Sequence, residues 1–432
     1  MSPSRPPAGA VAATESRPPP TRWRAVARVA ATHAAPWCYA LALGFWASSW
    51  NLRLSVLMAW LPFVPVVVAS FAVALCVVHR LGQPLRVPIA VAGPLLMLVL
   101  GFLPGALLSE DIGAGPAKVA TMSFVVLPVV LAAALLLDSR EARQGWIWTQ
   151  LLFGVAVAIA ATASPHVSAA QPGRFTLATV DTVTTARFIG VAVVVLLLVG
   201  LTSPRRHWWG FPAAALCGIV LVYVGSRGPA LIALIAVLVV VIAGRCFAGR
   251  RLVPLGIMVV SSVVAYRFAL VDGGTGGRRI IETLQSGLYD GTREELLRSA
   301  IHLGLAHPMG IGWGDFAQNS AIGRELANAD GVSYAHNMFA EAFSEGGILA
   351  LLALALVVVL ALVRLQRLSV HPQDAVVLGT LVYWLLNAQI SSDLVGNRFM
   401  WISLACGLAA YADASRLRAR PQQHYPKPDN AN

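Results

Sequence analysis

Charged residues are scarce in this 432-residue chain: they make up 12% of it, against 57% hydrophobic residues and a mean hydropathy of +0.70. A soluble domain of this size does not bury so much apolar surface, which indicates a chain embedded in a bilayer. Lysine is almost missing, with Lys118 and Lys427 the only two. The arginines are scattered between apolar runs, so the net charge of +12 does not indicate nucleic-acid binding.

Metal and nucleotide motifs are also lacking. The sequence has no DxD, no HExxH, no CxxC and no GxGxxG or Walker loop. The cysteines all lie in or beside apolar runs and form no disulfide framework; they are Cys38, Cys76, Cys217, Cys246 and Cys406. We therefore expect neither a metal ion nor a cofactor in the chemistry of this chain.

Apolar runs of about 20 residues, the length that crosses a bilayer as a helix, dominate the sequence. We predict twelve of them, at 34–51, 54–78, 87–108, 118–137, 146–164, 184–202, 210–225, 229–247, 252–271, 336–363, 374–391 and 397–413. No internal repeat and no βαβ pattern accompanies them. The sequence thus predicts an all-α polytopic membrane protein with about 12 transmembrane helices.

The arginines predict the orientation of these spans. With the N-terminus inside, every inside segment is basic, as the positive-inside rule requires, and both termini are cytoplasmic. Residues 1–32, rich in Pro and Arg, are predicted to be a disordered tail without a cleavable signal. Spans one to nine then occupy 33–271, spans ten to twelve occupy 336–413, and 414–432 form a second cytoplasmic tail.

The longest outside segment is residues 272–335. Within it, "TREELLRSAIHLGLAHP" predicts a helix with apolar positions at Leu296, Ala300, Leu303 and Leu305 that stops at the final proline. The following "GIGWGDF" predicts a turn-rich loop. We expect one large outer loop with helical content.

Three arginines lie at the outer edges of apolar runs, where they oppose the orientation signal: Arg187, Arg227 and Arg398. Each alone has two open interpretations, snorkelling to headgroups or binding a ligand. Three arginines at one depth favour the binding of one shared anion, because a guanidinium pairs bidentately with phosphate. In "GSRGP" the glycines permit close backbone approach, and Pro229 opens a helix with Arg227 at its anion-favouring N-terminal end.

The stretch "YAHNMFAEAFSEGGILALL" places polar groups at the mouth of an apolar run. His336 has two open interpretations, a packed or capping histidine and a general base. Asn337 has three: cap, orienting group or sugar ligand. Glu341 and Glu345, four residues apart on one helical face, either orient the histidine or pair with arginines.

Several of these stretches together resemble bacterial O-antigen ligases and the related O-antigen polymerases. "SRGPALIALIAVLVVV" is similar to the Ser-Arg-Gly helix start of that family, and "GTREELLRSAIHLGLAHPMGIGWGDF" to its outer-loop pattern of Arg, helix and His-Pro-x-Gly-x-Gly. "HNMFAEAFSEGGILA" is similar to its His-Asn helix start, with Gly347 after a nine-residue gap and Ala350 where the family often has Gly or Thr. With "RFTLATVDTVTTARFIG" and "DLVGNRFMW", the resemblance covers roughly residues 165–405.

The resemblance implies a GT-C-like glycosyltransferase of the bacterial inner membrane, with the large loop and the active site facing the periplasm. It implies a glycan donor on undecaprenyl diphosphate, an acceptor that is lipid A-core or another glycan, and inverting, metal-independent transfer. Arg227, Arg293 and His336 match the essential residues of the family, and Arg187 is implied as a phosphate ligand. The other expected substrate-binding residues are Arg174, Arg279, Asn337, Glu341 and Arg398.

The sequence favours an O-antigen ligase over its alternatives, because the large loop comes late and the His-Asn match is close. An O-antigen or exopolysaccharide polymerase uses the same chemistry. A protein O-glycosylating relative usually carries a longer outer C-terminal region. A transporter or flippase uses buried charges as well, but predicts inverted repeats, which we do not find.

Overall fold

The structure is a computed structural model. The residues that it describes are 22–51, 64–83, 89–109, 114–163, 166–167, 175–176, 180–247, 256, 267, 291–330 and 334–419. The chain divides into two compact units, Met1–Ala35 and Pro36–Asn432. All of the candidate site residues belong to the second unit.

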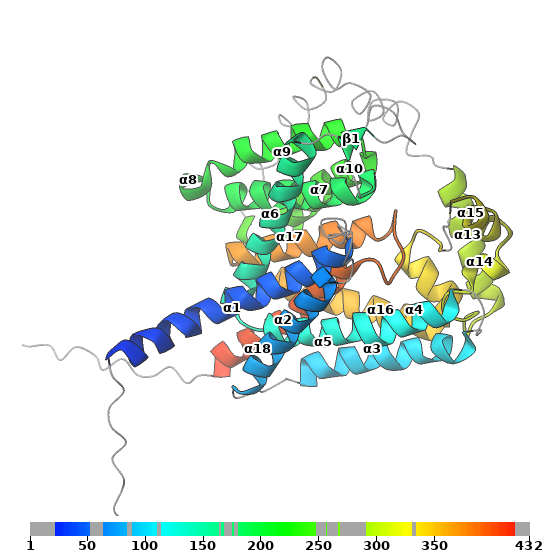
Figure 1. Cartoon of the computed structure of the whole chain (residues 1–432), viewed down its shortest axis with the longest axis horizontal. Helices are drawn as coiled ribbons and strands as arrows, with labels where there is room; N and C mark the ends of the chain where they lie inside the picture. The colour runs from blue at the N-terminus through cyan, green and yellow to red at the C-terminus, as the bar shows by residue number, and fades with distance from the viewer. Residues whose placement is uncertain are drawn as a thin grey trace, which may run out of the picture. The chain divides into compact units, whose positions relative to one another are not determined.

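The described part of the chain is almost entirely helical (Figure 1). Its α-helices are α1 (Arg22–Asn51), α2 (Val64–Leu81), α3 (Ile89–Leu108), α4 (Gly115–Thr121), α5 (Leu127–Leu136), α6 (Arg140–Ala163), α7 (Thr182–Thr202), α8 (Pro204–His207), α9 (Gly210–Val224), α10 (Arg227–Ala243), α13 (Gly291–Ala306), α14 (Phe316–Asn319), α15 (Ala321–Asp330), α16 (Met338–Leu368), α17 (Pro372–Asn387) and α18 (Arg398–Ala419). A π-helical turn, Met122–Val126, joins α4 to α5, and Arg245–Phe247 form a 3₁₀ turn. Two-residue strands β1 (His166–Val167) and β2 (Phe175–Thr176) pair antiparallel.

The helices agree with the predicted spans. Each predicted span except 252–271 overlaps a described helix, and nearly all of that one lies outside the described residues. Six helical segments in the described part are long and apolar enough to cross a membrane, and α9, α10 and part of α18 are shorter apolar helices. The prediction of a helical, multi-pass membrane protein is confirmed at this level.

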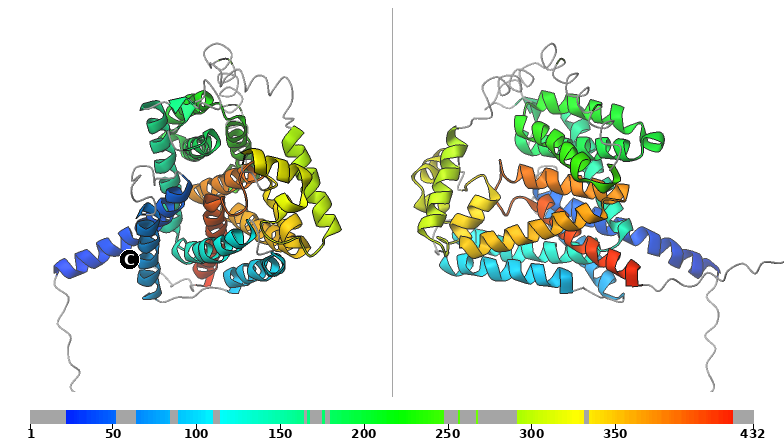
Figure 2. Two further views of the ribbon diagram at one scale, coloured as in Figure 1. Left: turned by 45° about the vertical axis from the view of Figure 1, so that its right-hand side comes forward. Right: turned by 180° about the vertical axis from the view of Figure 1, so that it is seen from behind.

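Helix α7 forms the buried centre of one half of the bundle, and it contacts α6, α9, α10 and α17 (Figures 1 and 2). Small residues bring its neighbours close, as is usual where helices pack within a membrane. Gly154 of α6 lies against Phe188 and Ala192, and Gly190 lies under the ring of Tyr383. The Tyr383 hydroxyl donates to the Arg187 carbonyl at 2.9 Å, which fixes α17 against the first turns of α7.

Helices α3 and α16 make the corresponding close contact in the other half (Figure 1). A Cβ added at Gly101 would overlap Ala353, and one at Gly105 would overlap Gly346, so only glycine permits this approach. Helix α16 is interrupted at Gly347, whose φ of 78° and ψ of −174° are not helical. The helix therefore consists of a short part before Gly347 and a long part after it.

Helices α13, α14 and α15 lie together at one end of the bundle, near the start of α16 (Figures 1 and 2). They share a small core made of Leu296, Ala300, Leu303, Phe316, Ala335 and Ala340. The predicted helix over this segment is confirmed as α13, but the expectation that Leu305 belongs to its apolar face is wrong, because Leu305 is 69% exposed. It lies about two and a half turns from Leu296 and so faces the opposite side.

Candidate active site

The segment between α17 and α18, residues 387–398 with the sequence "NAQISSDLVGNR", is the centre of the candidate site. Several distant elements hydrogen-bond to its backbone. The Met338 amide donates to the Ala388 carbonyl at 3.1 Å, and the Asn337 Nδ2 donates to the Gln389 carbonyl at 3.3 Å. A Cβ at Gly228 would overlap Ile390, so the start of α10 also lies against the segment.

Arg187, in the second turn of α7, is buried against this segment. Its Nη2 donates to the carbonyls of Asn387, at 3.1 Å, and Ser391, at 2.5 Å, and its buried Nε has no hydrogen-bond partner. Among the described residues, no carboxylate forms an ion pair with it. Asp181 lines the same cavity as Arg187 and interacts with it electrostatically without forming an ion pair, so the positive charge of the buried guanidinium is only partly compensated.

Arg187 lines a cavity of about 190 Å³, which we call the Arg187 cavity. Asp181, Thr184 and Phe188 come from the same end of α7, Trp384 from α17, and Trp50 from α1; the other lining residues are Ser392, Gly396, Asn397 and Phe399. Arg398 stacks its guanidinium on the Trp50 ring, 4.7 Å from the centroid. Arg398 therefore stands beside the wall of the cavity, as a cation–π partner of Trp50.

Of the remaining predicted arginines, two are exposed at helix starts and two lie outside the described residues. Arg227 is exposed and begins α10, as predicted, after Gly225 has ended α9 in a left-handed conformation with φ of 70°. Arg293 is exposed in the first turn of α13 and lies close enough to Arg187 to interact with it electrostatically. Arg174 and Arg279 lie outside the described residues.

His336 and Asn337 form the entry to α16. Asn337 is the N-cap, because its side-chain oxygen accepts from the amides of Phe339 and Ala340 at 3.1 and 3.0 Å. His336, the residue before it, has a φ of 55°, in the left-handed region. Its ring lies 4.6 Å from that of Tyr334. Burial raises the pKa of Tyr334 to about 12, so its hydroxyl stays protonated at neutral pH.

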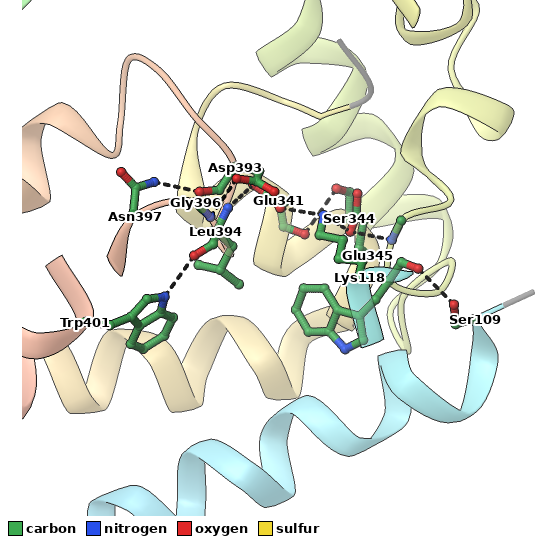
Figure 3. Close-up of polar contacts among 12 residues, drawn as sticks. Ser109, Lys118, Glu341, Ser344, Glu345, Asp393, Leu394, Gly396, Asn397 and Trp401 are labelled. Carbon is green, nitrogen blue, oxygen red and sulfur yellow. Dashed lines mark hydrogen bonds and ion pairs between the residues drawn. The ribbon is translucent and has the colours of Figure 1, made fainter. Parts of the chain in front are cut away.

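Glu341 and Glu345 pair with neither His336 nor an arginine but with Lys118, in α4 (Figure 3). The Lys118 Nζ lies 2.5 Å from an oxygen of each carboxylate, and both glutamates are fully buried. The Leu394 amide also donates to Glu341 at 2.9 Å, and the Gly314 amide donates to Glu345 at 2.8 Å. The cluster thus connects α4, α16, the 387–398 segment and the loop that carries Gly314.

The sequence motifs gave Lys118 no role. A signal was present, since Lys118 is the one lysine among the predicted spans and lysine within a membrane helix is costly. It lines a second cavity of about 230 Å³, the Lys118 cavity, with Thr121, Gly314, Tyr334 and Asp393; Ala114, Ala117 and Val395 complete the lining. In the described part of the chain, no three His, Cys, Asp or Glu side chains gather as a metal site requires.

The glycines of the outer loop fit into the break in α16. Gly310, Gly312 and Gly314 have φ of 91°, 104° and 86°, which confirms the predicted turn-rich loop. The Ile348 amide, just after the break, donates to the Pro308 carbonyl at 2.8 Å. The His-Pro-x-Gly-x-Gly pattern therefore packs against Gly347, which lies 37 residues after Gly310. This contact holds the Lys118 cluster in place.

The fold and the site define a multi-pass membrane protein with buried cationic groups gathered at one end of its helices. Residues 212–355 match the model of the family described as O-Antigen ligase. This segment, a third of the chain, is similar to that family, in agreement with the resemblance of the sequence motifs. The match supports an activity of the O-antigen ligase or polymerase type.

Other comparisons add little. No curated protein matches this chain in sequence. A chain of a solved structure, described as "Structural coordination of polymerization and crosslinking by a peptidoglycan synthase complex", aligns with a TM-score of 0.43 at 18% identity. The alignment covers 78% of this chain and 100% of that one. A likeness of that size does not define a shared function.

Proposed function

We propose that this protein is an O-antigen ligase of the bacterial inner membrane, acting at its periplasmic face. It transfers a glycan from undecaprenyl diphosphate to lipid A-core, with inversion at the anomeric carbon and without a metal ion. The observation that carries the proposal is the buried Arg187 side chain, which lines a cavity and whose hydrogen bonds to described residues go to carbonyls. A buried cation that forms no ion pair with a described carboxylate is suited to an anionic ligand such as a diphosphate.

The donor diphosphate binds against Arg187, with Arg227 and Arg293 completing its neutralisation from the starts of α10 and α13. Arg174, Arg279 and Arg398 are further candidates for contacts with the donor. Both Arg227 and Arg293 occupy first helical turns, where the helix dipole also favours an anion. The guanidinium groups stabilise the charge that develops on the leaving diphosphate.

His336 acts as the general base. It takes the proton of the acceptor hydroxyl, the hydroxyl oxygen bonds to the anomeric carbon, and the bond from that carbon to the diphosphate oxygen breaks. Undecaprenyl diphosphate leaves with the electron pair. Asn337 caps the helix that follows, and the Glu341–Lys118 pair holds α16 against α4, so both act as positioning residues in this scheme.

The test is a transfer assay with the purified protein. The donor is undecaprenyl-diphosphate-linked glycan extracted from a strain that lacks the gene, and the acceptor is lipid A-core from that strain. His336→Asn is the sharpest variant, because asparagine also adopts positive φ and so keeps the backbone at residue 336. We expect transfer to fall by about 100-fold or more, as for the loss of a general base. Wild-type rates in His336→Asn would refute its role, and no transfer by the wild-type protein would refute the function.

A polymerase is the second candidate, because the same chemistry joins one repeat unit to another. The lipopolysaccharide of the gene-deletion strain separates the two. Loss of a ligase leaves bare lipid A-core and accumulated lipid-linked polymer, whereas loss of a polymerase leaves core that carries one unit. A transporter would move lipid-linked glycan between leaflets of a proteoliposome without forming a new glycosidic bond.

A further inference from the structure

The two cavities are lined by opposite sides of one stretch of chain. Ser392, Gly396 and Asn397 line the Arg187 cavity, whereas Asp393 and Val395 line the Lys118 cavity. Their volumes, about 190 and 230 Å³, are similar. The 387–398 segment therefore contributes to the walls of both cavities.

Each cavity is lined by one cation and one carboxylate, Arg187 with Asp181 and Lys118 with Asp393, but the two cations have different partners. Arg187 contributes a cation that no described carboxylate pairs with. In the Lys118 cavity, the one ammonium group is already shared by Glu341 and Glu345, and Asp393 adds a third carboxylate (Figure 3). Two carboxylates therefore already neutralise the Lys118 ammonium, which is not available to a diphosphate, whereas Asp393 can accept hydrogen bonds from sugar hydroxyl groups.

The Lys118 cavity also adjoins the group that takes the proton. Tyr334 lines the cavity and its ring contacts that of His336. Its hydroxyl is protonated, so it donates a hydrogen bond to a sugar oxygen while Asp393 accepts one from a sugar hydroxyl. A sugar in this cavity therefore stands beside the imidazole, and Tyr334 is also close enough to Arg187 to interact with it electrostatically.

We propose that the Lys118 cavity is the acceptor subsite, which holds a sugar ring by its hydroxyl groups, while the donor diphosphate occupies the Arg187 cavity. This assignment rests on the proposed function and adds which cavity takes which substrate. Asp393 and Tyr334 are then specificity-determining contacts to the acceptor. Lys118 fixes the two glutamates and does not bind phosphate.

The test fills the cavity rather than removing a contact. Ala117 is an exposed residue of α4 that lines the Lys118 cavity, so Ala117→Trp blocks the space without breaking a hydrogen bond. Ala120 is an exposed residue of the same helix that does not line the cavity, so Ala120→Trp is the matched control. Asp393→Asn is a second probe, since it keeps an oxygen for the Gly396 amide, which donates at 2.7 Å, but loses the charge.

Initial rates of transfer are measured while lipid A-core and undecaprenyl-diphosphate-linked glycan, both from the gene-deletion strain, are varied in turn. We expect Ala117→Trp and Asp393→Asn to raise KM for the acceptor by about tenfold or more, with KM for the donor within about twofold of wild type. Ala120→Trp should change neither. A rise in KM for the donor instead of the acceptor would overturn the assignment. An unchanged KM for the acceptor in Asp393→Asn would also overturn it, and this variant decides the question if Ala117→Trp does not fold. Absence of transfer by the wild-type protein would instead overturn the function itself.

Discussion

Arg143 and Arg187 are the same residue type, equally buried at 3% and 7% exposure, in two helices that pack against each other. Arg143 has a carboxylate partner, since its Nε lies 3.3 Å from Asp374 Oδ1. The hydrogen bonds that Arg187 makes to described residues go to carbonyls, and Asp181 acts on it only electrostatically. The contact of Gly154 with Phe188 puts the two arginines about 17 Å apart along α6. The buried Arg143 thus has a structural role, whereas the buried Arg187 has the character of a ligand-binding group.

The largest effect is expected from breaking the most completely paired cation. Lys118→Met leaves Glu341 and Glu345 buried beside each other without a counter-charge. We expect the free energy of unfolding to fall by about 3–5 kcal/mol, seen as a lower Tm in detergent. Adding Glu341→Gln and Glu345→Gln should restore most of the loss. A Tm equal to that of wild type in Lys118→Met would show that the cluster does not stabilise the fold.

The direct comparison is Arg187→Met against Arg143→Met. Arg187→Met should reduce transfer by about 100-fold, or about 2.7 kcal/mol, because a donor to the developing charge is lost. Its Tm should stay at or above that of wild type, since a buried cation that is only partly compensated is removed. Arg143→Met should do the reverse, with a lower Tm and an unchanged kcat for the folded protein. The proposed difference between the two arginines would be refuted if both variants had a lower Tm and neither had a lower kcat.

A substitution can place a carboxylate next to Arg187, so that Arg187 resembles the ion-paired Arg143. Thr184 lines the same cavity three residues earlier in α7, so Thr184→Glu offers an i, i+3 partner. We expect KM for the donor to rise by about tenfold with no loss of Tm, because the glutamate competes with the diphosphate for the guanidinium. Thr184→Gln has the same size without the charge and should bind the donor more tightly than Thr184→Glu. Equal donor KM values in the two variants would argue against an anion at Arg187.

The smallest effect is expected where a charged pair is exposed. Arg298 pairs with Glu294 on the outside of α13 and is 77% exposed. Arg298→Ala should change the free energy of unfolding by no more than about 0.5 kcal/mol, because exposed pairs are screened by water and salt. Thermal unfolding at low and at high salt measures this. A large loss would mean that Arg298 is buried by a partner or a substrate.

Local patterns made much of this molecule predictable. Apolar runs gave the spans, "SRGP" gave the start of α10 at Arg227, and the glycines of "GIGWGDF" gave the turns. Periodicity also gave α13, though the inclusion of Leu305 shows that an apolar residue is not proof of a buried face.

Contacts between distant positions were not predictable from those patterns. Lys118 and Glu345 are 227 residues apart, and no local periodicity connects them. The 387–398 segment was noticed only for its last residues, although its carbonyls hold Arg187 and Asn337. Backbone groups are the same in every residue, so a site built on them leaves almost no trace in the sequence.

The break at Gly347 has a consequence for how the protein folds. Because the Pro308 carbonyl accepts from Ile348, and the Ile311 and Gly312 amides donate to Ser344 and Glu345, the outer loop supplies part of the hydrogen-bond ladder of α16. Backbone groups of α16 on both sides of the break thus find their hydrogen-bond partners in that loop. Loop and helix therefore form one cooperative unit, and amide protons of both should exchange with solvent in a single opening event.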